Sequence, residues 1–412
     1  MNDYIGKIKF WIRQRYNSIV NSIAFYPAFI SLTFLIISFI LIRFDFSETG
    51  RQLKSSLPWL GLKDAATARN IIAVVAGGIL SLTVFSFSMV MIVLNQAASQ
   101  MSNRVLNKLI GNRFQQIVLG SYIGTIMFAL FLLTTIRDID SGIHIPSIST
   151  YTLIILSIID IFLFIYFLHY ITQSVKYEVI INRILNVTHE SMEDTCQLHK
   201  EPDTVPDTDF TYEIIAPDTG VFEGVDVKYL LKICNEEDCR VYWKHTPGTF
   251  LLKGLPVLQT DKKLDDDVVK KIQNTLYLNN DEAIANNFLY GFRQLTEVGV
   301  KALSPGINDP GTASLALRSL FQLYNYRICF FPAAIIKDKN DIPRIYTNNP
   351  DFEEIFKTSV LPIWDYGKDD RIIQEEMKRL LEQFISLNPN AEMENFLGDV
   401  VQYAGIEKNK FK

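Results

Sequence analysis

The segment Ile71–Leu94, IIAVVAGGILSLTVFSFSMVMIVL, decides the fold class, because it carries no charged residue. About 20 apolar residues suffice for a helix to cross a bilayer, so this segment predicts a transmembrane helix. We expect the same helix to continue to Asn112 through a polar and basic stretch. Its small and polar residues recur at helical steps that place them on one face. The residues of this face are Gly77, Ser81, Ser88, Asn95, Ser99 and Ser102.

Two interpretations of this polar face remain open. Turned inward in an oligomer, it would line a pore ending at a basic mouth, formed by Arg104 and Lys108, that favours anions. Alternatively, small residues let helices pack closely without water, which is slightly favoured within one subunit. The amides of Asn95 and Gln100 exceed what packing requires. The candidate pore-lining residues are Ser81, Ser88, Asn95, Ser99, Ser102, Arg104 and Lys108.

Three further long uncharged runs predict membrane helices. The first run is not expected to be a cleaved signal peptide, because it has full span length and no small-residue cleavage site precedes Arg43. In the third run, Gly120 and Gly124 lie four residues apart, a spacing that favours close helix packing. The four predicted spans are residues 23–42, 71–94, 117–136 and 151–170.

Basic residues flank the predicted spans unevenly. Some precede the first span, and others, without an acidic neighbour, separate the second span from the third. These residues are Lys7, Lys9, Arg13, Arg15, Arg104, Lys108 and Arg113. The positive-inside rule therefore favours cytoplasmic termini. The loop between the first two spans is also basic, which weakens this assignment.

Asp160 is the acidic residue inside the predicted spans. A carboxylate at membrane depth is costly unless it is neutral, paired or in contact with water, and no Lys or Arg lies at matching depth. A protonated, hydrogen-bonded carboxyl and a proton- or cation-linked site are both open. His169, near the end of the same helix, is favoured as a helix cap over a pH sensor.

After residue 171 the chain becomes richer in charge and reads as soluble. We expect an integral membrane α-helical protein with a basic cytoplasmic N-terminal segment, four transmembrane helices, a connecting helix and linker, and a cytoplasmic α+β domain. Their ranges are 1–22, 23–170, 171–206 and 207–412. The predicted strands are 212–216 and 240–245, and the predicted helices are 176–192, 226–235, 265–277, 281–303, 310–326, 371–387 and 393–403. The net charge of −5, without a basic domain, gives no case for a nucleic-acid partner.

The segment Ala302–Ala313, ALSPGINDPGTA, is the sharpest local motif of the C-terminal part. Pro305-Gly306 ends one helix, and Asp309 or Asn308 caps the next. Such a helix start also presents free N–H groups that could hold an anion. A rigid corner that docks one element against another is favoured over an anion site.

Arg293 precedes this loop by about three helical turns. Glu297 stands one turn from it, so a pair along the helix is expected, with an anion held at the loop as the alternative. The candidate ligand or interface residues are Arg293, Ser304, Asn308, Asp309 and Thr312.

Signatures of catalysis do not occur in the sequence. It has no Gly-rich phosphate loop, no Gly-x-Ser-x-Gly elbow and no His-Glu-x-x-His motif. The five His are not clustered, and the four Cys lack zinc or disulfide spacing. We therefore expect neither an enzyme nor a bound metal or cofactor.

Several motifs occur in the order typical of one family. Gly291-Phe-Arg-Gln-Leu295 leads into Lys301–Pro310 and Thr312-Ala313 and resembles the hallmark of the DUF2254 family of bacterial predicted membrane proteins. Further matches are Phe85–Ser88, Gln96–Gln100, Arg104, Gln116–Gly120, Phe167–His169, Gln173-Ser174, Pro247–Phe250 and Gly254. The resemblance covers most of residues 10–330. It implies an inner-membrane protein of several spans with a cytoplasmic C-terminal domain, and it implies no known activity.

The chain departs from the family pattern at one place. The family tends to carry Gln-Asp shortly before the Gly-x-Arg-Gln-Leu run, where this chain has Asn286-Asn287. A site that used this acid would be altered here.

Two functions follow as expectations. The first is a homo-oligomeric channel or transporter in the bacterial inner membrane, with a pore lined by the second span and gated by the C-terminal domain through the Pro305–Pro310 corner. Its expected partners are the lipid bilayer and a small anion or other ion. The alternative is a membrane-anchored sensor or scaffold whose soluble domain binds a ligand or a partner protein.

Overall fold

A computed structural model describes residues 24–57, 59, 62, 64–100, 113–136, 145–174, 176–199, 210–279 and 282–409. The chain divides into two compact units, Met1–Lys176 and Tyr177–Lys412. We call them the membrane unit and the C-terminal unit and describe each by itself.

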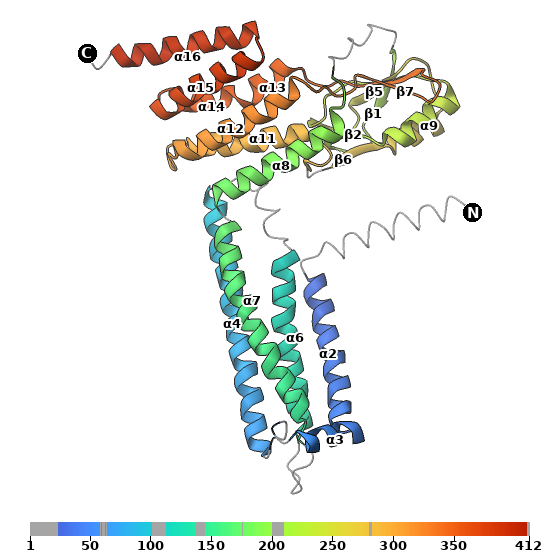
Figure 1. The fold of residues 1–412 in the computed structure, drawn as a ribbon. Coiled ribbons are helices and arrows are strands. Elements are labelled where there is room, and N and C mark those ends of the chain that lie inside the picture. The colour runs from blue at the N-terminus through green and yellow to red at the C-terminus, as the bar shows by residue number, and fades with distance from the viewer. Residues whose placement is uncertain are drawn as a thin grey trace. The chain divides into compact units, whose positions relative to one another are not determined.

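Four long helices form the described part of the membrane unit, with the short helix α3 at one end (Figure 1). All four are long and apolar enough to cross a bilayer, which confirms the predicted number of spans. The helices extend beyond several predicted ends, because polar residues continue the helical backbone outside the apolar stretch. Their bounds are α2 Phe25–Asp45, α3 Glu48–Ser56, α4 Ala65–Gln100, α6 Arg113–Thr135 and α7 Ser147–Ser174.

Helix α6 packs closely against α2 through its two glycines. A Cβ atom at Gly120 would lie 3.0 Å from Pro27 Cα, and one at Gly124 would lie 2.7 Å from the ring of Phe34. Only the absence of a side chain permits this approach, so the packing role expected from the glycine spacing is confirmed.

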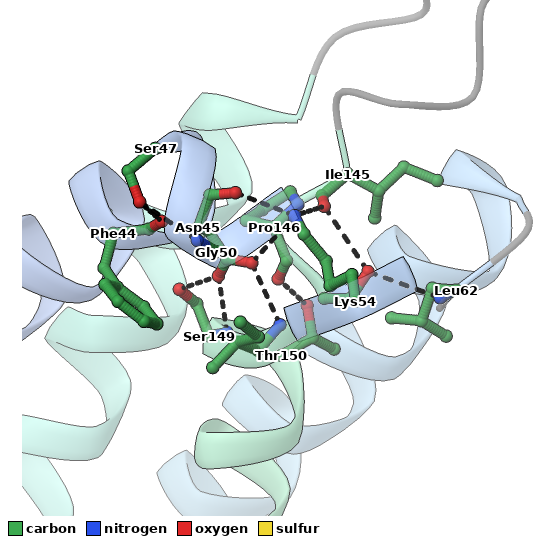
Figure 2. A network of polar contacts seen from close by, with 12 residues as sticks. Phe44, Asp45, Ser47, Gly50, Lys54, Leu62, Ile145, Pro146, Ser149 and Thr150 are labelled. Carbon is green, nitrogen blue, oxygen red and sulfur yellow. Dashed lines mark hydrogen bonds and ion pairs between the residues drawn. The ribbon is translucent and has the colours of Figure 1, made fainter. Parts of the chain in front are cut away.

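A buried carboxylate joins three helices at one end of this bundle (Figure 2). Asp45, the last residue of α2, is fully buried. Its carboxylate accepts hydrogen bonds from the backbone N–H groups of Ile148 and Ser149, at 3.1 and 2.7 Å, and from the Ser149 hydroxyl at 2.5 Å. It therefore caps the start of α7 from another helix, and it satisfies N–H groups that have no partner inside α7.

Lys54 of α3 completes this contact. Its ammonium group lies 3.1 Å from the Asp45 carboxylate and donates to the Asp45 backbone carbonyl at 2.8 Å. Its side chain is mostly buried.

The C-terminal unit contains two sheets. The larger has the strand order β1-β5-β3-β8-β7, and the smaller has the order β4-β2-β6. All pairs are antiparallel except β3 with β8, where Val241 lies opposite Ile345. The strands are β1 Tyr212–Ile215, β2 Gly220–Val225, β3 Val241–Trp243, β4 Thr249–Leu251, β5 Pro256–Thr260, β6 Leu276–Asn279, β7 Ile335–Lys337 and β8 Pro343–Tyr346.

Helices α9 and α10 pack on these strands, and the other helices of this unit form a layered group (Figure 1). Within this group, α8 contacts both α11 and α12, and α15 contacts α12 and α16. The helices are α8 Tyr177–Thr195, α9 Val227–Glu237, α10 Asp266–Gln273, α11 Phe288–Ala302, α12 Pro310–Arg327, α13 Phe352–Ser359, α14 Leu361–Gly367, α15 Arg371–Leu387 and α16 Ala391–Asn409.

Two helix predictions were too long. The predicted helix 265–277 ends at Gln273, and Leu276–Asn279 instead forms strand β6 beside β2. The predicted helix 281–303 begins only at Phe288, because the Asn287 side chain accepts a hydrogen bond from the N–H of Leu289 and caps the helix there. In both cases a polar turn residue outweighed the helical periodicity.

Candidate functional site

The polar face of α4 points away from the other described helices of the membrane unit. Gly77, Ser81, Ser88 and Asn95 are all exposed, and nothing lies within 4 Å of a Cβ built at Gly77. The interior side of α4 instead carries Ser86, which is buried. Packing within one subunit, which the spacing slightly favoured, is therefore wrong for this face. The side chain of Ser99 and all of Ser102, Arg104 and Lys108 lie outside the described residues.

The hydroxyl groups of this face are satisfied by their own helix. Ser81 donates to the carbonyl of Gly77 at 3.0 Å, and Ser88 donates to that of Val84 at 2.9 Å. Each serine keeps its lone pairs toward the outside, so the face can accept hydrogen bonds without exposing an unpaired donor. Such a face can line water or contact another copy.

Asp160 faces the interior of the membrane unit. Its side chain is fully buried, and one carboxylate oxygen accepts a hydrogen bond from the Ser121 hydroxyl of α6 at 2.6 Å. Buried hydroxyl groups of α4 and α6 surround it, which the sequence did not indicate. His169, by contrast, is exposed on α7.

The loop of the Ala302–Ala313 motif is held together by its own polar groups. The Asp309 carboxylate accepts hydrogen bonds from the N–H and the hydroxyl of Thr312, at 3.1 and 2.6 Å, and caps α12. The Ser304 hydroxyl donates to the carbonyl of Lys301, and Asn308 is exposed with a φ of 48°. The helix start already holds a carboxylate where an anion would bind, which favours the rigid corner.

Tyr177, at the start of α8, lies near this corner. Burial, and to a smaller extent the negative charge of Asp309, raise the pKa of the Tyr177 hydroxyl. The cap of α12 and the start of α8 thus meet inside the C-terminal unit.

Arg293 does not reach the loop. Its guanidinium pairs with Glu282 and lies 3.5 Å from the carbonyl oxygen of Gly248. A Cβ at Gly248, whose φ is +95°, would lie 2.5 Å from this guanidinium, so the glycine makes room for it. The structure therefore brings together the Pro247–Phe250 turn and the Gly-x-Arg-Gln-Leu run, which are distant in sequence. The structure pairs Arg293 with Glu282, an acid that the helical spacing did not indicate.

A buried acid that the sequence did not indicate lies close by. Glu223 of β2 is 3% exposed, and its carboxylate accepts hydrogen bonds from the side chains of Asn279 and Asn286 and from the N–H of Ala283. Three donors satisfy this carboxylate, so it ties strand β2 to the segment before α11. Asn286 belongs to the Asn-Asn pair that departs from the family pattern.

A groove lies between α8, α12 and α15 of the C-terminal unit. Its volume is about 800 Å³, and its lining includes His189, Arg318, Glu376 and Arg379. The buried Glu376 carboxylate binds Arg318 through two hydrogen bonds of 2.7 and 3.0 Å and also pairs with Arg379. Both arginines remain about half exposed at the groove. No sequence motif pointed to this groove, because its residues come from three separated helices.

The ion pairs of Glu376 predict a loss of stability in acid. Arg318, and then Arg379, hold the pKa of the Glu376 carboxyl below its ordinary value of 4.5. A lowered folded-state pKa stabilises the fold at pH values above 4.5, and this contribution is lost as the pH falls through the folded-state pKa. Glu376→Gln should therefore cost about 1–3 kcal/mol at neutral pH and progressively less in acid.

Thermal unfolding of the two proteins across a pH series checks this expectation. Glu382→Gln on the same helix is the matched control, because Glu382 is exposed and its pair with Lys378 spans 4.0 Å. If Glu376→Gln remained less stable than the wild type by the same amount down to the most acidic pH, the expectation would be contradicted.

Metal and disulfide chemistry find no support in the described residues. No group of three or more His, Cys, Asp or Glu among them is placed to hold a metal ion. All four cysteines are free thiols.

The profile of a family of predicted membrane proteins, DUF2254, matches residues 20–383 of the chain. The chain belongs to the DUF2254 family. The match includes the described helices of the membrane unit and most of the C-terminal unit. DUF2254 is defined as a family of predicted membrane proteins, which agrees with the four candidate spans.

Two mycobacterial relatives are named as uncharacterised proteins. An uncharacterised protein of Mycobacterium bovis and one of Mycobacterium tuberculosis are each 22% identical to the chain over 331 residues. The alignments cover 76% of this DUF2254 chain and 63% of each relative, so the chain spans less than two thirds of their length. No solved structure matches the chain.

Proposed function

We propose that the protein is a homo-oligomeric channel or transporter of the bacterial inner membrane, and that the α4 face lines its pathway. The observation that carries this proposal is the exposure of Gly77, Ser81, Ser88 and Asn95 on one side of α4, uncovered by any other described element. A polar face inside a membrane is unfavourable against lipid tails, so a second copy or water is the better neighbour.

The composition of the face agrees with a pathway between subunits. Val84 and Met91 lie on the same side and are also exposed, so apolar and polar rings would alternate along the helix. Gly77, which has open space around it, lets a neighbouring backbone approach. Alternating rings of this kind pass ions through hydroxyls and amides and restrict them at the apolar positions.

The remaining features of the proposal follow from the sequence. Arg104 and Lys108 would give the pathway a basic mouth and a preference for a small anion. Both termini and the C-terminal unit would be cytoplasmic, and the C-terminal unit would regulate conduction through the Pro305–Pro310 corner. The proposal includes no enzymatic activity and no cofactor.

Ion flux in proteoliposomes tests the proposal. Ser88→Leu and Asn95→Leu should each reduce anion flux by about tenfold or more, because an apolar side chain dewets the pathway. The matched control is Phe87→Leu, which is also exposed but lies about 100° around the helix from Ser88.

The oligomeric state of each variant in mild detergent completes the experiment. We expect all three variants to assemble like the wild type. A monomeric wild-type protein, or flux that is unchanged in both α4 variants, would overturn the proposal, because one subunit cannot enclose a pathway along a single exposed face.

The groove of the C-terminal unit supports a second candidate function, a sensor that binds an anionic ligand. Arg318 and Arg379 present half-exposed guanidinium groups beside a hollow of about 800 Å³. Guanidinium groups bind carboxylate and phosphate through paired hydrogen bonds. Calorimetric titration of the full chain with pyrophosphate tests this function. Arg379→Gln should abolish the heat of binding, and Lys378→Gln should leave it unchanged.

A further inference from the structure

A group of buried polar side chains lies between α4, α6 and α7, on the side of α4 opposite its exposed face. Asp160 of α7, Tyr122 and Thr125 of α6 and Ser86 of α4 are each at most 4% exposed. Ser121 adds a hydroxyl that donates to one Asp160 oxygen at 2.6 Å. The cluster lies inside one subunit and is therefore separate from the proposed pathway.

Several atoms of this cluster lack hydrogen-bond partners. Among the described residues, no partner is present for the second carboxylate oxygen of Asp160 or for the hydroxyls of Thr125, Tyr122 and Ser86. The Thr125 hydroxyl nevertheless lies close to the Asp160 carboxylate, and the Ser86 hydroxyl lies close to that of Tyr122, which also lies in the field of Asp160. Buried polar groups without partners are rare in native proteins, and the second Asp160 oxygen is the one among these that calls for a positive occupant.

The negative charge of the Asp160 carboxylate also needs a positive charge close to it. The described residues 25–42 of α2, 70–100 of α4, 114–135 of α6 and 147–174 of α7 contain no Lys or Arg. The neighbouring titratable group is Tyr122 of α6, while α4 contributes the hydroxyl of Ser86, and α2 has no charged residue before Arg43. A bare carboxylate in this place is unfavourable, so the negative charge calls for one positive charge bound directly to it.

A small cavity adjoins the cluster. Its volume is about 160 Å³, and Ser86 and Tyr122 line it together with Gln115, Gln116 and Phe167. Most of its lining is apolar, and Asp160 is not among the lining residues, so the cavity is a poor site for water. An ion at Asp160 would therefore take its oxygen ligands from the protein.

We propose that Asp160 is the anionic ligand of an intramembrane site for a single monovalent cation, H⁺ or Na⁺, with the hydroxyls of Ser121, Thr125 and Tyr122 as further oxygen ligands. A bound proton would sit on the unpartnered Asp160 oxygen and donate to Thr125 or Tyr122. A sodium ion would take the same oxygens without a proton. Both occupants neutralise the site, and each excludes the other. The site goes beyond the proposed conduction pathway, since none of these residues belongs to the exposed face of α4.

Carbodiimide labelling of the full chain in proteoliposomes tests the site, because a hydrophobic carbodiimide reacts with protonated carboxyl groups inside membranes. We expect Asp160 to be labelled, as mapped by peptide mass, and Asp160→Asn to lose that label. If H⁺ alone binds, labelling falls as the pH rises and NaCl has no more effect than choline chloride. If Na⁺ competes, NaCl protects Asp160 and choline chloride does not.

Two threonines of α6 provide a matched pair of variants. Thr125→Val removes an oxygen of the proposed site and should raise the half-protecting cation concentration by about threefold to tenfold, as expected for one lost ligand. Thr134→Val should change nothing, because the Thr134 hydroxyl is exposed and bonded to its own helix. Asp160 labelling that is the same at every pH and in both salts, or no Asp160 labelling in protein shown to be folded, would overturn the proposal. Neither readout depends on ion conduction.

Discussion

Replacing Asp45 with alanine is expected to lower the free energy of unfolding of the membrane unit by about 3–5 kcal/mol, the cost of breaking a buried ion pair by removing one partner. The variant leaves the Lys54 ammonium without its carboxylate. It also leaves the N–H groups of Ile148 and Ser149 without an acceptor at the start of α7. We expect α2, α3 and the start of α7 to separate first. Reversible unfolding in a denaturing-detergent titration, followed by helical circular dichroism, measures the change.

Two further variants separate the ion pair from the general effect of losing an acid. Glu48→Ala removes an exposed acid from the first turn of α3 and should cost at most about 1 kcal/mol. Adding Lys54→Met to Asp45→Ala should recover part of the loss, because it removes the unpaired charge. An Asp45→Ala protein as stable as Glu48→Ala would show that the contact contributes little.

Gly291→Ala is expected to destabilise the C-terminal unit by about 3 kcal/mol, the upper end of the usual cost of overpacking. A Cβ at Gly291 would overlap the hydroxyl of Thr188 on α8 and lie 2.7 Å from its methyl carbon. Thr188 is fully buried, and its hydroxyl donates a hydrogen bond to the carbonyl of Ile184. Its side chain therefore cannot rotate away from the new Cβ without losing this hydrogen bond. Helix α8 must therefore shift away from α11. Thermal unfolding of the purified protein gives the magnitude.

Gly306→Ala is the matched control in the same unit. Nothing lies within 4 Å of a Cβ at Gly306, and its φ does not lie in the left-handed region, so alanine should change stability by no more than about 1 kcal/mol. Equal unfolding temperatures for the two variants would contradict the close approach of α8 to α11.

Much of the helical structure could be predicted from local sequence. The four spans are visible as long uncharged runs, and α15 begins and ends at the predicted residues Arg371 and Leu387 because its apolar periodicity is regular. Asp226, the first residue of the predicted helix 226–235, caps α9 and accepts the N–H of Tyr229 at 3.0 Å. Each of these features depends on residues within a few positions of one another.

Contacts between distant residues were not predictable. Asp45 and Ser149 meet across 104 positions, and the residues of the α8–α12–α15 groove are equally scattered. Strand β8 is only four residues long, so its sequence alone does not predict a strand. It is recognisable as one only through its pairing with β3 and β7. Helical spacing predicted which residues of α4 share the polar face. The direction in which this face points became clear only from the packing of the opposite side of α4. For the same reason, sequence identified Asp160 and not the hydroxyls around it.

The position of β8 has a consequence for the order in which the chain folds during synthesis. Strand β8 lies between β3 and β7 in the larger sheet, although about a hundred residues separate it from β3 in the chain. The strands β1, β5 and β3 can pair as soon as they are made, yet one edge stays open until Tyr346 has left the ribosome. All four membrane helices precede this point. The chain is thus tethered to its bilayer before the sheet is complete, and this open edge is exposed to misassembly while synthesis continues.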